Sequence, residues 1–477
     1  MLSFSRIKKI HFVGIGGIGV SALAKMMLLA DKEVSGSDLN MSDITDDLKK
    51  LGASIFKGHR KSNLPPAADL IIYSSAASKD NPERQEAFNK GVPQLSYFEA
   101  LGLLSKGKFT IAVSGTNGKT TVTAMTGLIL ERAGLDPTVV VGSKVKEFGG
   151  FAGQQASNFR QGKSGYFVVE ACEYQAHMLE LNPQIIILTN IEEDHLDYYR
   201  NLRHIQSTFQ TYIDKLPQNG VLILNVDDPV SRKFKLPKCR VITYGIRNKA
   251  EVTAKNVKVE NGYQKFDVHF GKAAAPRTLN FLLRLPGRFN VYNALAAIAG
   301  SLNLGIRPEV GRDVLTDFSG IWRRFEKVGV IPIHGSSVTD YPAVISDYAH
   351  HPTAIQGTIQ GAKDFYPGKR LVVVFQPHQR NRTRKLFSDF VRSFSGADLL
   401  IVSEIYDVAG RENKEDKNIS SKDLVQTIKK RFNSNNIFFT RDLPQTKSLI
   451  FKKVRPNDLI LIMGAGDIDK VARGLVK

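Results

Sequence analysis

The feature that most constrains the fold of this chain is one run of consecutive residues: Gly115, Thr116, Asn117, Gly118, Lys119, Thr120 and Thr121. It follows the apolar residues 109–113 and precedes a helical pattern at 122–132. Between a strand and a helix, such a loop wraps phosphates with its backbone N–H groups, and its lysine neutralises the β- and γ-phosphates. A hydroxyl, expected here from Thr120, reaches a magnesium ion. The two glycines stand three apart rather than five, so this is a variant phosphate loop.

Short β-branched runs alternate with amphipathic stretches along the whole chain. The runs lie at 10–13, 70–73, 109–113, 166–169, 185–188, 221–224, 371–375, 399–402 and 459–463. Near-continuous apolar strands separated by helical periods are typical of parallel α/β sheets buried on both faces. Breaks near 104–108 and 320 divide the chain into three expected α/β domains, at 1–105, 106–320 and 321–477.

Composition narrows the class of protein. The 477 residues are 42% hydrophobic and 23% charged, which is ordinary globular usage. No apolar run approaches the ~18 residues of a membrane span, and the first residues lack the apolar stretch of a secretory signal. Two cysteines, Cys172 and Cys239, make no disulfide framework, so we expect a cytoplasmic protein without a membrane partner, as a monomer or homodimer.

The formal net charge of +20 is spread over the last two-thirds of the chain. No long basic arm occurs, and no basic cluster is interleaved with aromatic residues as in a nucleic-acid platform. We therefore expect no nucleic-acid partner. Solvated surface charge is the main interpretation of the excess, and attraction of phosphate-bearing small molecules is the second.

A second glycine-rich turn follows the first expected strand and precedes a helical stretch at 21–30; it contains Gly14, Gly16, Gly17, Ile18 and Gly19. Its glycines allow a tight turn and close approach of a diphosphate to the helix N-terminus. Asp38, at the end of the next expected strand, can accept from a ribose hydroxyl. We also expect Ser74, after the run 70–73, to contact the nucleotide. NAD and other diphosphate nucleotides remain alternatives at this point.

Two further expected strands end in metal-ligating side chains. Glu170 follows the run 166–169, with Glu173 three residues later, and His195 follows the run 185–188. A carboxylate leaving a core strand beside a phosphate loop is where magnesium is usually held. Two separated ligands indicate two Mg²⁺ ions around a γ-phosphoryl group and its acceptor. Cys172 has no local histidine partner and is interpreted as an inert core thiol.

Four segments together resemble the ATP-dependent Mur ligases of peptidoglycan synthesis: GTNGKTT, VVEACEY at 168–174, TNIEEDHLDYY at 189–199 and PGRFNVYNALAAIA at 286–299. The resemblance implies three domains: an N-terminal Rossmann-like domain for a UDP-sugar, a central P-loop ATPase-like domain, and a C-terminal Rossmann-like α/β domain. It thus favours UDP over NAD at the first glycine turn. A chain with its own ATP loop has no need of NAD.

The resemblance also assigns roles within the central domain. Lys119 is the phosphate lysine, Thr120, Glu170 and His195 hold Mg²⁺, and His195 also borders the UDP-sugar. Asn290 and Asn293 lie by the adenine, and Arg324 contacts ATP from the hinge into the third domain. One departure is Phe289, where family members commonly carry histidine.

In the third domain, the run Asp347-Tyr-Ala-His350-His351-Pro352 follows an expected strand at 344–346, and Asp347 or His350 could act as the base. His378, Arg380 and Arg382 offer donors for a carboxylate, which an arginine fork binds in bidentate fashion. With Gly410-Arg-Glu-Asn413 and residues 463–468, these segments resemble the family members that add L-alanine. Ser346 and Gln379 depart from the pattern of those members.

The activity so implied is ATP-dependent ligation of L-alanine to the lactyl carboxylate of UDP-N-acetylmuramate through an acyl phosphate. The main alternative is the family member that recycles a whole tripeptide onto UDP-N-acetylmuramate. The segment Thr353-Ala354-Ile355, after the histidine pair, resembles the sequence of that enzyme. Two other classes are a UDP-sugar sensor without turnover and a nicotinamide dehydrogenase. The intact phosphate loop with Glu170 and His195 argues against the sensor, and the presence of a second phosphate loop argues against the dehydrogenase.

Overall fold

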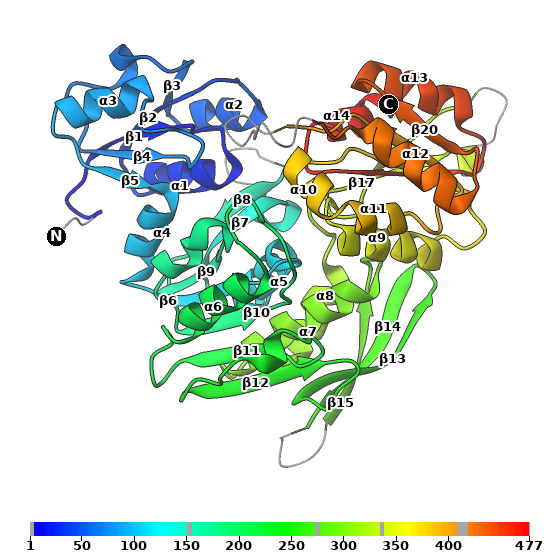
Figure 1. The fold of residues 1–477 in the computed structure, drawn as a ribbon. Helices are drawn as coiled ribbons and strands as arrows, with labels where there is room; N and C mark the ends of the chain where they lie inside the picture. The colour runs from blue at the N-terminus through cyan, green and yellow to red at the C-terminus, as the bar shows by residue number, and fades with distance from the viewer. Residues whose placement is uncertain (1–3, 150–154, 272–276, 334–337, 408–417, 477) are drawn as a thin grey trace.

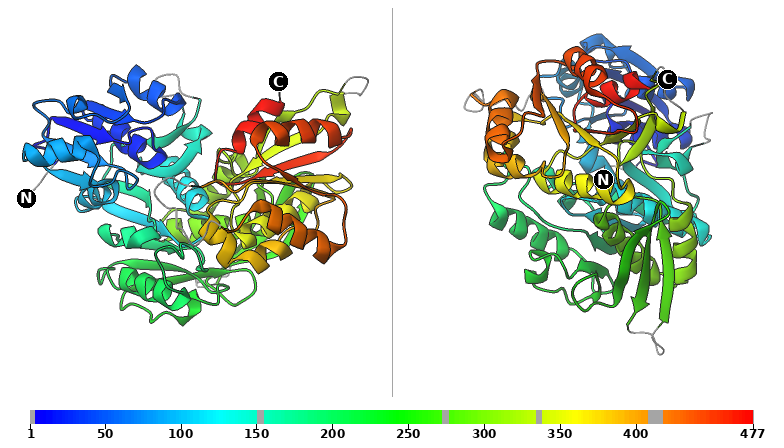
Figure 2. Two further views of the ribbon diagram at one scale, coloured as in Figure 1. Left: turned by 45° about the horizontal axis from the view of Figure 1, so that its top comes forward. Right: turned by 90° about the vertical axis from the view of Figure 1, so that its right-hand side faces the viewer.

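The computed structural model describes residues 4–149, 155–271, 277–333, 338–407 and 418–476. Within them the expected three-domain α/β architecture is confirmed, since the strands form three separate sheets. Figure 1 shows the first domain in blue and the third in orange and red, both above the central domain, and the views of Figure 2 agree. In these described ranges, no helix is both long and apolar enough to cross a membrane.

The first sheet has the strand order β3-β2-β1-β4-β5, and all its neighbouring strands are parallel. Its strands are β1 (Lys9–Val13), β2 (Glu33–Asp38), β3 (Ser54–Lys57), β4 (Leu70–Tyr73) and β5 (Gln94–Ser96). The helices of this domain are α1 (Ile18–Leu29), α2 (Asp43–Lys50), η1 (Lys61–Asn63), α3 (Pro82–Asn89) and α4 (Tyr97–Ser105). The expected helix at 21–30 thus begins three residues earlier, directly on the glycine turn.

The central sheet has the order β15-β14-β13-β12-β11-β10-β6-β9-β7-β8. Its strands are β6 (Phe109–Ser114), β7 (Thr138–Val145), β8 (Ser157–Arg160), β9 (Tyr166–Glu170), β10 (Ile185–Leu188), β11 (Val221–Asn225), β12 (Arg240–Gly245), β13 (Val252–Glu260), β14 (Tyr263–Phe270) and β15 (Arg277–Leu283). Its helices are α5 (Lys119–Arg132), η2 (Lys146–Phe148), η4 (Tyr174–Glu180), α6 (Leu202–Ile213), η5 (Ser231–Lys233), α7 (Arg288–Leu302) and α8 (Pro308–Asp317).

The third sheet has the order β16-β17-β21-β18-β19-β20. Its strands are β16 (Glu326–Val330), β17 (Ala343–Asp347), β18 (Leu371–Phe375), β19 (Leu399–Ser403), β20 (Ile437–Thr440) and β21 (Leu459–Met463). Its helices are η6 (Val338–Asp340), α9 (Pro352–Phe365), α10 (Arg380–Lys385), α11 (Phe387–Arg392), α12 (Ser421–Phe432), α13 (Leu443–Lys453) and α14 (Asp469–Leu475).

The expectation of purely parallel sheets is wrong at the edges of two sheets. Strands β13, β14 and β15 form an antiparallel meander, and β8 and β16 also pair antiparallel with their neighbours. Along β14 buried and partly buried residues alternate, which is the pattern of a strand covered mainly on one face. Such strands carry no long apolar run, so the sequence pattern that revealed the buried parallel strands missed them.

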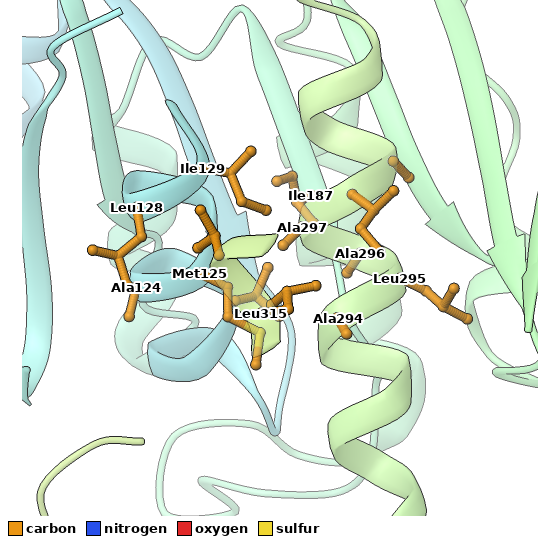
Figure 3. Close-up of a cluster of buried hydrophobic side chains, with 14 of the residues drawn as sticks. Ala124, Met125, Leu128, Ile129, Ile187, Ala294, Leu295, Ala296, Ala297 and Leu315 are labelled. Atoms are coloured by element: carbon orange, nitrogen blue, oxygen red, sulfur yellow. The ribbon is translucent and has the colours of Figure 1, made fainter. Parts of the chain in front are cut away.

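The core of the central domain follows from the alternation of side chains along β10. Ile185 and Ile187 point to the face covered by α5 and α7, whereas Ile186 and Leu188 pack with α6 on the other face. Figure 3 shows Ile187 between the two helices, with Met125 and Ile129 of α5 and small alanines of α7 around it. These alanines let α7 lie close to α5, so the helix that carries Asn290 and Asn293 is held beside the phosphate loop.

The link between the central and third domains is tied to β7. The Trp322 backbone N–H donates to the Lys144 carbonyl at 3.0 Å, and Ser143 Oγ donates to the Trp322 carbonyl at 2.9 Å. Directly after this anchor, Arg323 and Phe325 have φ values of +58° and +49°. Non-glycine residues rarely adopt this region, so the change of chain direction is confined to a few strained positions.

Replacing Ile187 with alanine should destabilise the central domain by about 2–5 kcal/mol, because the surrounding helices cannot fully close the resulting cavity. The matched variant Ile187→Val removes one methyl group and should cost about 1 kcal/mol. Urea unfolding followed by circular dichroism measures both. Equal losses in the two variants would contradict the packing seen in Figure 3.

Candidate active site

The phosphate loop is pressed against the end of β10. Gly115 has a φ of +129°, and a Cβ added there would lie 2.1 Å from Thr189 Oγ1. The Thr116 backbone N–H donates to the Asn190 carbonyl at 2.7 Å. Gly118, with a φ of +88°, directly precedes the first residue of α5. The loop therefore leads into a helix N-terminus, which is the arrangement that binds phosphate.

Lys119 is buried within this loop and is held by three acceptors. Its Nζ donates to the carbonyls of Gly115 and Thr116 at 2.6 and 3.0 Å and to Glu173 Oε1 at 3.0 Å. Burial lowers the pKa of Lys119, but the Glu173 carboxylate outweighs it and raises that pKa. Burial raises the pKa of Glu173, but the charges and hydrogen bonds of Lys119 and His195 together lower that pKa below its ordinary value. Both groups are therefore charged at neutral pH.

Glu170, the last residue of β9, lies between the phosphate loop and the hinge. Its Oε1 accepts from the Gly142 backbone N–H at 2.6 Å, and Thr120 also hydrogen-bonds to it. Arg324 Nη2 in turn donates to Thr120 Oγ1 at 3.5 Å. Burial raises the pKa of Glu170, and the charges of Lys119 and Arg324 only partly offset this. The structure thus brings together three residues expected in the site from three separate regions of the sequence.

His195 lies on the other side of Lys119, with its backbone at a φ of +52°. Its Nε2 is 3.6 Å from Glu173 Oε1, and its ring lies 4.8 Å from that of Tyr174. The buried Nδ1 has no hydrogen-bond partner among the described residues. Glu173 was noticed in the sequence but assigned no role. In the structure it joins Lys119 to His195.

Magnesium fits this set of donors. The described residues contain no cluster of three or more His, Cys, Asp or Glu side chains that could hold a metal by themselves. Magnesium rarely uses such a cage, however, since it is usually bound by one or two carboxylates together with substrate phosphates and water. The Glu170 carboxylate beside the Thr120 hydroxyl matches that mode, and His195, whose Nδ1 has no partner among the described residues, lies beside Glu173.

In the first domain, the glycine turn is bound to the end of β2. The Ser37 carbonyl accepts from the backbone N–H groups of Gly14 and Ile15, and Asp38 Oδ2 accepts from that of Gly16 at 2.9 Å. Ser74 flanks the turn, because a Cβ on Gly14 would lie 2.9 Å from the Ser74 Cβ. The expected contacts for a UDP-sugar therefore gather at one edge of the first sheet.

Tyr97 connects this turn to the central domain. A Cβ on Gly19 would lie 2.8 Å from its ring, so only glycine fits there. Burial raises the pKa of Tyr97, and the Glu170 carboxylate raises it further, which places this phenol within electrostatic range of the phosphate-loop site. Asn158 of β8 also donates to the Ile18 carbonyl at the start of α1. The first domain thus meets the central domain at its glycine turn.

Asn290 and Asn293 lie one helical turn apart on α7, as expected. Asn293 Nδ2 donates to Asn290 Oδ1 at 2.9 Å, and Asn290 Nδ2 donates to the Pro286 carbonyl at 2.7 Å. A Cβ on Gly118 would lie 2.4 Å from Asn293 Oδ1. Asn293 therefore touches the phosphate loop itself, while Asn290 closes the start of its own helix. Phe289 packs against α9 near Gly357 of the third domain.

Asp347 and His350 lie where the third domain meets the hinge. Both Asp347 oxygens accept backbone hydrogen bonds, from Phe325 and Ala349 at 2.7 Å each. Burial raises the pKa of Asp347, although the Arg324 charge opposes this. Burial and the Arg382 charge lower the pKa of His350 well below its ordinary value. His350 Nδ1 lies 2.9 Å from the Tyr348 carbonyl, to which it can only donate, so Nε2 of the neutral ring is left as an acceptor.

Arg382 does not project freely into a substrate site. Its Nε and Nη2 donate to Asp194 Oδ1 at 3.0 and 2.8 Å, and its Nη1 donates to the His378 carbonyl at 3.2 Å. The side chains of Arg382 and Asp194 are only 6% and 9% exposed. Burial raises the pKa of Asp194, but Arg382 and the other positive groups around the carboxylate together hold that pKa well below its ordinary value.

A small hollow opens beside this ion pair, lined by residues 194–197 of the central domain and by Gln379, Asn381, Arg382 and Leu386 of the third. His378 stacks on Tyr406 at 5.7 Å next to His350. Arg380 is turned elsewhere, since its Nε donates to Asp407 Oδ2 at 2.8 Å. The structure thus gathers His378 and Arg382 but not Arg380. The segment Gly410–Asn413 lies outside the described residues.

Three residues of the site escaped the sequence analysis: Gly142, Tyr97 and Asp194. A Cβ on Gly142, within β7, would lie 2.8 Å from Glu170 Oε2, so a side chain there would displace the Glu170 carboxylate. Each of the three lies far along the chain from the residue it contacts: Gly142 contacts Glu170, Tyr97 contacts Gly19, and Asp194 contacts Arg382. No sequence motif contains both members of any of these pairs. Asp194 could have been found as a third carboxylate in the segment before His195.

Comparison with known proteins covers nearly the whole chain. Three family models match, described as Mur ligase family, catalytic domain (residues 9–109), Mur ligase middle domain (113–300) and Mur ligase, glutamate ligase domain (323–466). The UDP-N-acetylmuramate–L-alanine ligase of Clostridium tetani is 42% identical over 97% of both chains. The solved UDP-N-acetylmuramate–alanine ligase of Thermotoga maritima is 30% identical, with a TM-score of 0.79 and 98% of both chains covered. A murein peptide ligase of Psychrobacter arcticus is 25% identical, with a TM-score of 0.72 and the same coverage.

The variant Asp194→Asn should lower the free energy of unfolding by about 3–5 kcal/mol, because it leaves the buried Arg382 charge without a counter-charge. Asp389→Asn is the matched control, since Asp389 pairs with Arg392 at 3.7 Å on the exposed side of α11. That change should cost less than about 1 kcal/mol. Differential scanning calorimetry compares the two. Similar losses would show that the Asp194–Arg382 pair adds nothing to domain docking.

Proposed function

The chain belongs to the Mur ligase family, and we propose that it uses ATP to join L-alanine to the lactyl carboxylate of UDP-N-acetylmuramate, a step in peptidoglycan precursor synthesis. The curated relatives at 37–42% identity that carry this name support the proposal. The observation that carries it is the meeting of Lys119, Glu170 and Arg324 beside the glycine turn of the first domain.

The proposed reaction has two steps. In the first, an oxygen of the lactyl carboxylate attacks the γ-phosphorus of ATP, the bond to the β-phosphate oxygen breaks, and ADP leaves. In the second, the neutral amine of L-alanine attacks the acyl carbon of the resulting acyl phosphate, and inorganic phosphate leaves with the C–O bond electrons. The amine proton goes to a base. Acyl phosphates hydrolyse readily, so both steps need a site closed to water.

Lys119 and Arg324 stabilise the transferring phosphoryl group in this scheme. Charge on that group spreads over its equatorial oxygens, and fixed cations aimed at them lower the barrier. Lys119 is held in place by Glu173 and the loop carbonyls before any substrate arrives, so little reorganisation is needed. Arg324 is delivered by the hinge and so arrives with the third domain.

Thr120, Glu170 and His195 are the residues proposed to hold magnesium, as two ions. When bound, Mg²⁺ would neutralise charge on the phosphates. The Thr120 hydroxyl hydrogen-bonds to the Glu170 carboxylate near Lys119, and His195, from the segment after β10, lies beside Glu173, which pairs with Lys119. The family's use of ATP together with these donors supports the proposal.

His350 is the proposed base for the amine of L-alanine. Its neutral ring with a free Nε2 acceptor is the form that can take a proton. Asp347 is the weaker candidate, because both its oxygens are already engaged by backbone N–H groups. His378 and Arg382 are proposed to receive the amino-acid carboxylate, which would compete with Asp194 for the Arg382 guanidinium. The reaction is proposed to take place in the cytosol, where ATP is abundant.

The proposal is tested by phosphate release from purified protein with ATP, Mg²⁺ and UDP-N-acetylmuramate, offered L-alanine, glycine, L-serine or the tripeptide in turn. We expect release with L-alanine, and weaker release with glycine or L-serine, since such small differences are worth about 1–3 kcal/mol. Release with the tripeptide alone would instead identify a recycling ligase, and the absence of release with every acceptor would favour a UDP-sugar sensor.

Lys119→Ala should lower kcat in this assay by about 10²–10³-fold, because a fixed charge at the transferring phosphoryl group is lost. Lys385→Ala serves as the control. Lys385 Nζ donates to the Leu196 carbonyl across the same domain interface, so this variant removes a lysine from the interface but leaves the phosphate loop intact. Comparable losses of kcat in both variants would contradict the role given to Lys119.

A further inference from the structure

A fully buried carboxylate lies under the nucleotide edge of the first domain, outside the phosphate-loop site. Glu83, near the start of α3, is 0% exposed. Its Oε2 accepts from Ser37 Oγ at 2.5 Å and from His11 Nε2 at 3.3 Å. Its Oε1 accepts from Asn63 Nδ2 at 2.6 Å and from the Arg60 backbone N–H at 3.1 Å. Four donors from three segments thus converge on one side chain.

These contacts connect the segments that carry the expected UDP contacts. Ser37 precedes Asp38, and its carbonyl binds the glycine turn at Gly14 and Ile15. The segment after β3, which supplies Arg60 and Asn63, is joined to the same strand end because the Gly58 N–H donates to the Asp38 carbonyl at 2.7 Å. Glu83 itself follows the loop that begins at Ser74. Moving this carboxylate would therefore disturb three loops at once.

Glu83 is ionised in this network. Burial raises its pKa, but the hydrogen bonds from His11, Ser37 and Asn63 outweigh it and hold the pKa below its ordinary value. A carboxylate can only accept, so each of its four neighbours must donate toward it. This fixes the direction of every hydrogen bond around the carboxylate, including that of the single Ser37 hydroxyl proton.

The fixed direction determines the state of His59. Ser37 Oγ lies 2.8 Å from His59 Nδ1 and has already given its proton to Glu83. It must therefore accept from Nδ1–H, and in the neutral imidazole with this tautomer Nε2 is an acceptor. The His59 side chain is 17% exposed and directly follows Gly58, which binds Asp38. His59 thus follows the residue that is hydrogen-bonded to the backbone of Asp38, whose carboxylate is expected to bind the ribose.

We propose that Glu83 is a positioning residue for UDP-sugar binding: it holds the Asp38 strand end and the glycine turn in place, and through Ser37 it orients His59 to accept a hydrogen bond from the nucleotide. The donor would be a hydroxyl of the ribose or the N3–H of the uracil. The inference rests on the proposed function for the identity of the nucleotide. It concerns binding alone and needs no turnover.

The test is Glu83→Gln, which keeps the shape of the side chain but replaces one acceptor oxygen by a donor. The Kd for UDP, measured by calorimetry, and the KM for UDP-N-acetylmuramate should rise about tenfold or more, as expected for losing a hydrogen bond to a charged group. The KM values for ATP and L-alanine, and kcat at saturation, should stay within about twofold. If Glu83 only stabilised the fold, its replacement would not raise the Kd and KM for the UDP ligand while leaving the other kinetic constants unchanged.

Two variants of His59 distinguish the role of its Nδ1 from the role of its Nε2. An asparagine amide can keep the hydrogen bond to Ser37 while lacking anything at the position of Nε2, so His59→Asn and His59→Ala should weaken UDP binding about equally. Combined with Glu83→Gln, either change should add less than its separate effect, because both act on the same contact. Fully additive effects would show that Glu83 does not act through His59.

Asp69→Asn is the matched control in the same sheet. Asp69 accepts from the backbone N–H groups of Lys8 and Lys9 at 2.8 Å each, at the opposite end of β1 from the glycine turn. It should lower thermal stability without changing the Kd for UDP. An unchanged Kd in folded Glu83→Gln, or an equal rise of all three KM values, would overturn the proposal. Should Glu83→Gln fail to fold, Ser37→Ala and His59→Asn decide the matter by the same Kd measurement.

The two proposals fail in different ways. Wild-type protein that binds UDP but releases no phosphate with L-alanine would remove the proposed ligase activity and leave the role of Glu83 standing. If the wild-type protein makes the alanine product but the variants of Glu83 and His59 bind UDP as tightly as the wild type, the ligase activity stands and the role of Glu83 is removed.

Discussion

A lysine withdrawn from water inside a loop of backbone carbonyls needs a carboxylate beside it, and the catalytic region is organised around that need. Lys119 finds this carboxylate in Glu173, which also lies beside His195. Burial lowers the pKa of Lys119, and Glu173 contributes most to raising it, so the pair favours the charged lysine at the phosphate loop. The pair therefore links the phosphate loop after β6, the end of β9 and the segment after β10.

Around this pair, the contributions of the three domains differ in kind. The central domain supplies a preformed cradle, since its loop and Lys119 are already fixed by hydrogen bonds. The first domain supplies the glycine turn, held by Ser37 and Asp38. The strained hinge supplies Arg324, the third domain supplies His350, and the Asp194–Arg382 pair docks this domain against the central domain. Assembly of the site therefore depends on where the third domain lies.

The parts of the fold and site that the sequence revealed are those encoded locally. Each glycine turn stands within a few residues of its own strand and helix, and Lys119 and Thr120 directly follow the second turn, so each strand–turn–helix unit can be recognised in a single window. Glu170 and His195 were found because the carboxyl ends of parallel strands share one edge. The meander of β13, β14 and β15 was missed because its half-buried strands carry no apolar run. Tyr97, Gly142 and Asp194 were missed because their partners lie 78, 28 and 188 positions away along the chain, and no spacing rule connects them.

The anchor between β7 and the hinge contains the single tryptophan of the chain, Trp322. Its indole lies next to Arg323, whose guanidinium is 5.5 Å from the ring, and immediately before the residues where the third domain turns away. A cation near an indole and a change in its solvation both alter its emission. The molecule thus carries a natural fluorophore at its pivot, through which domain closure can be followed in solution without any attached label.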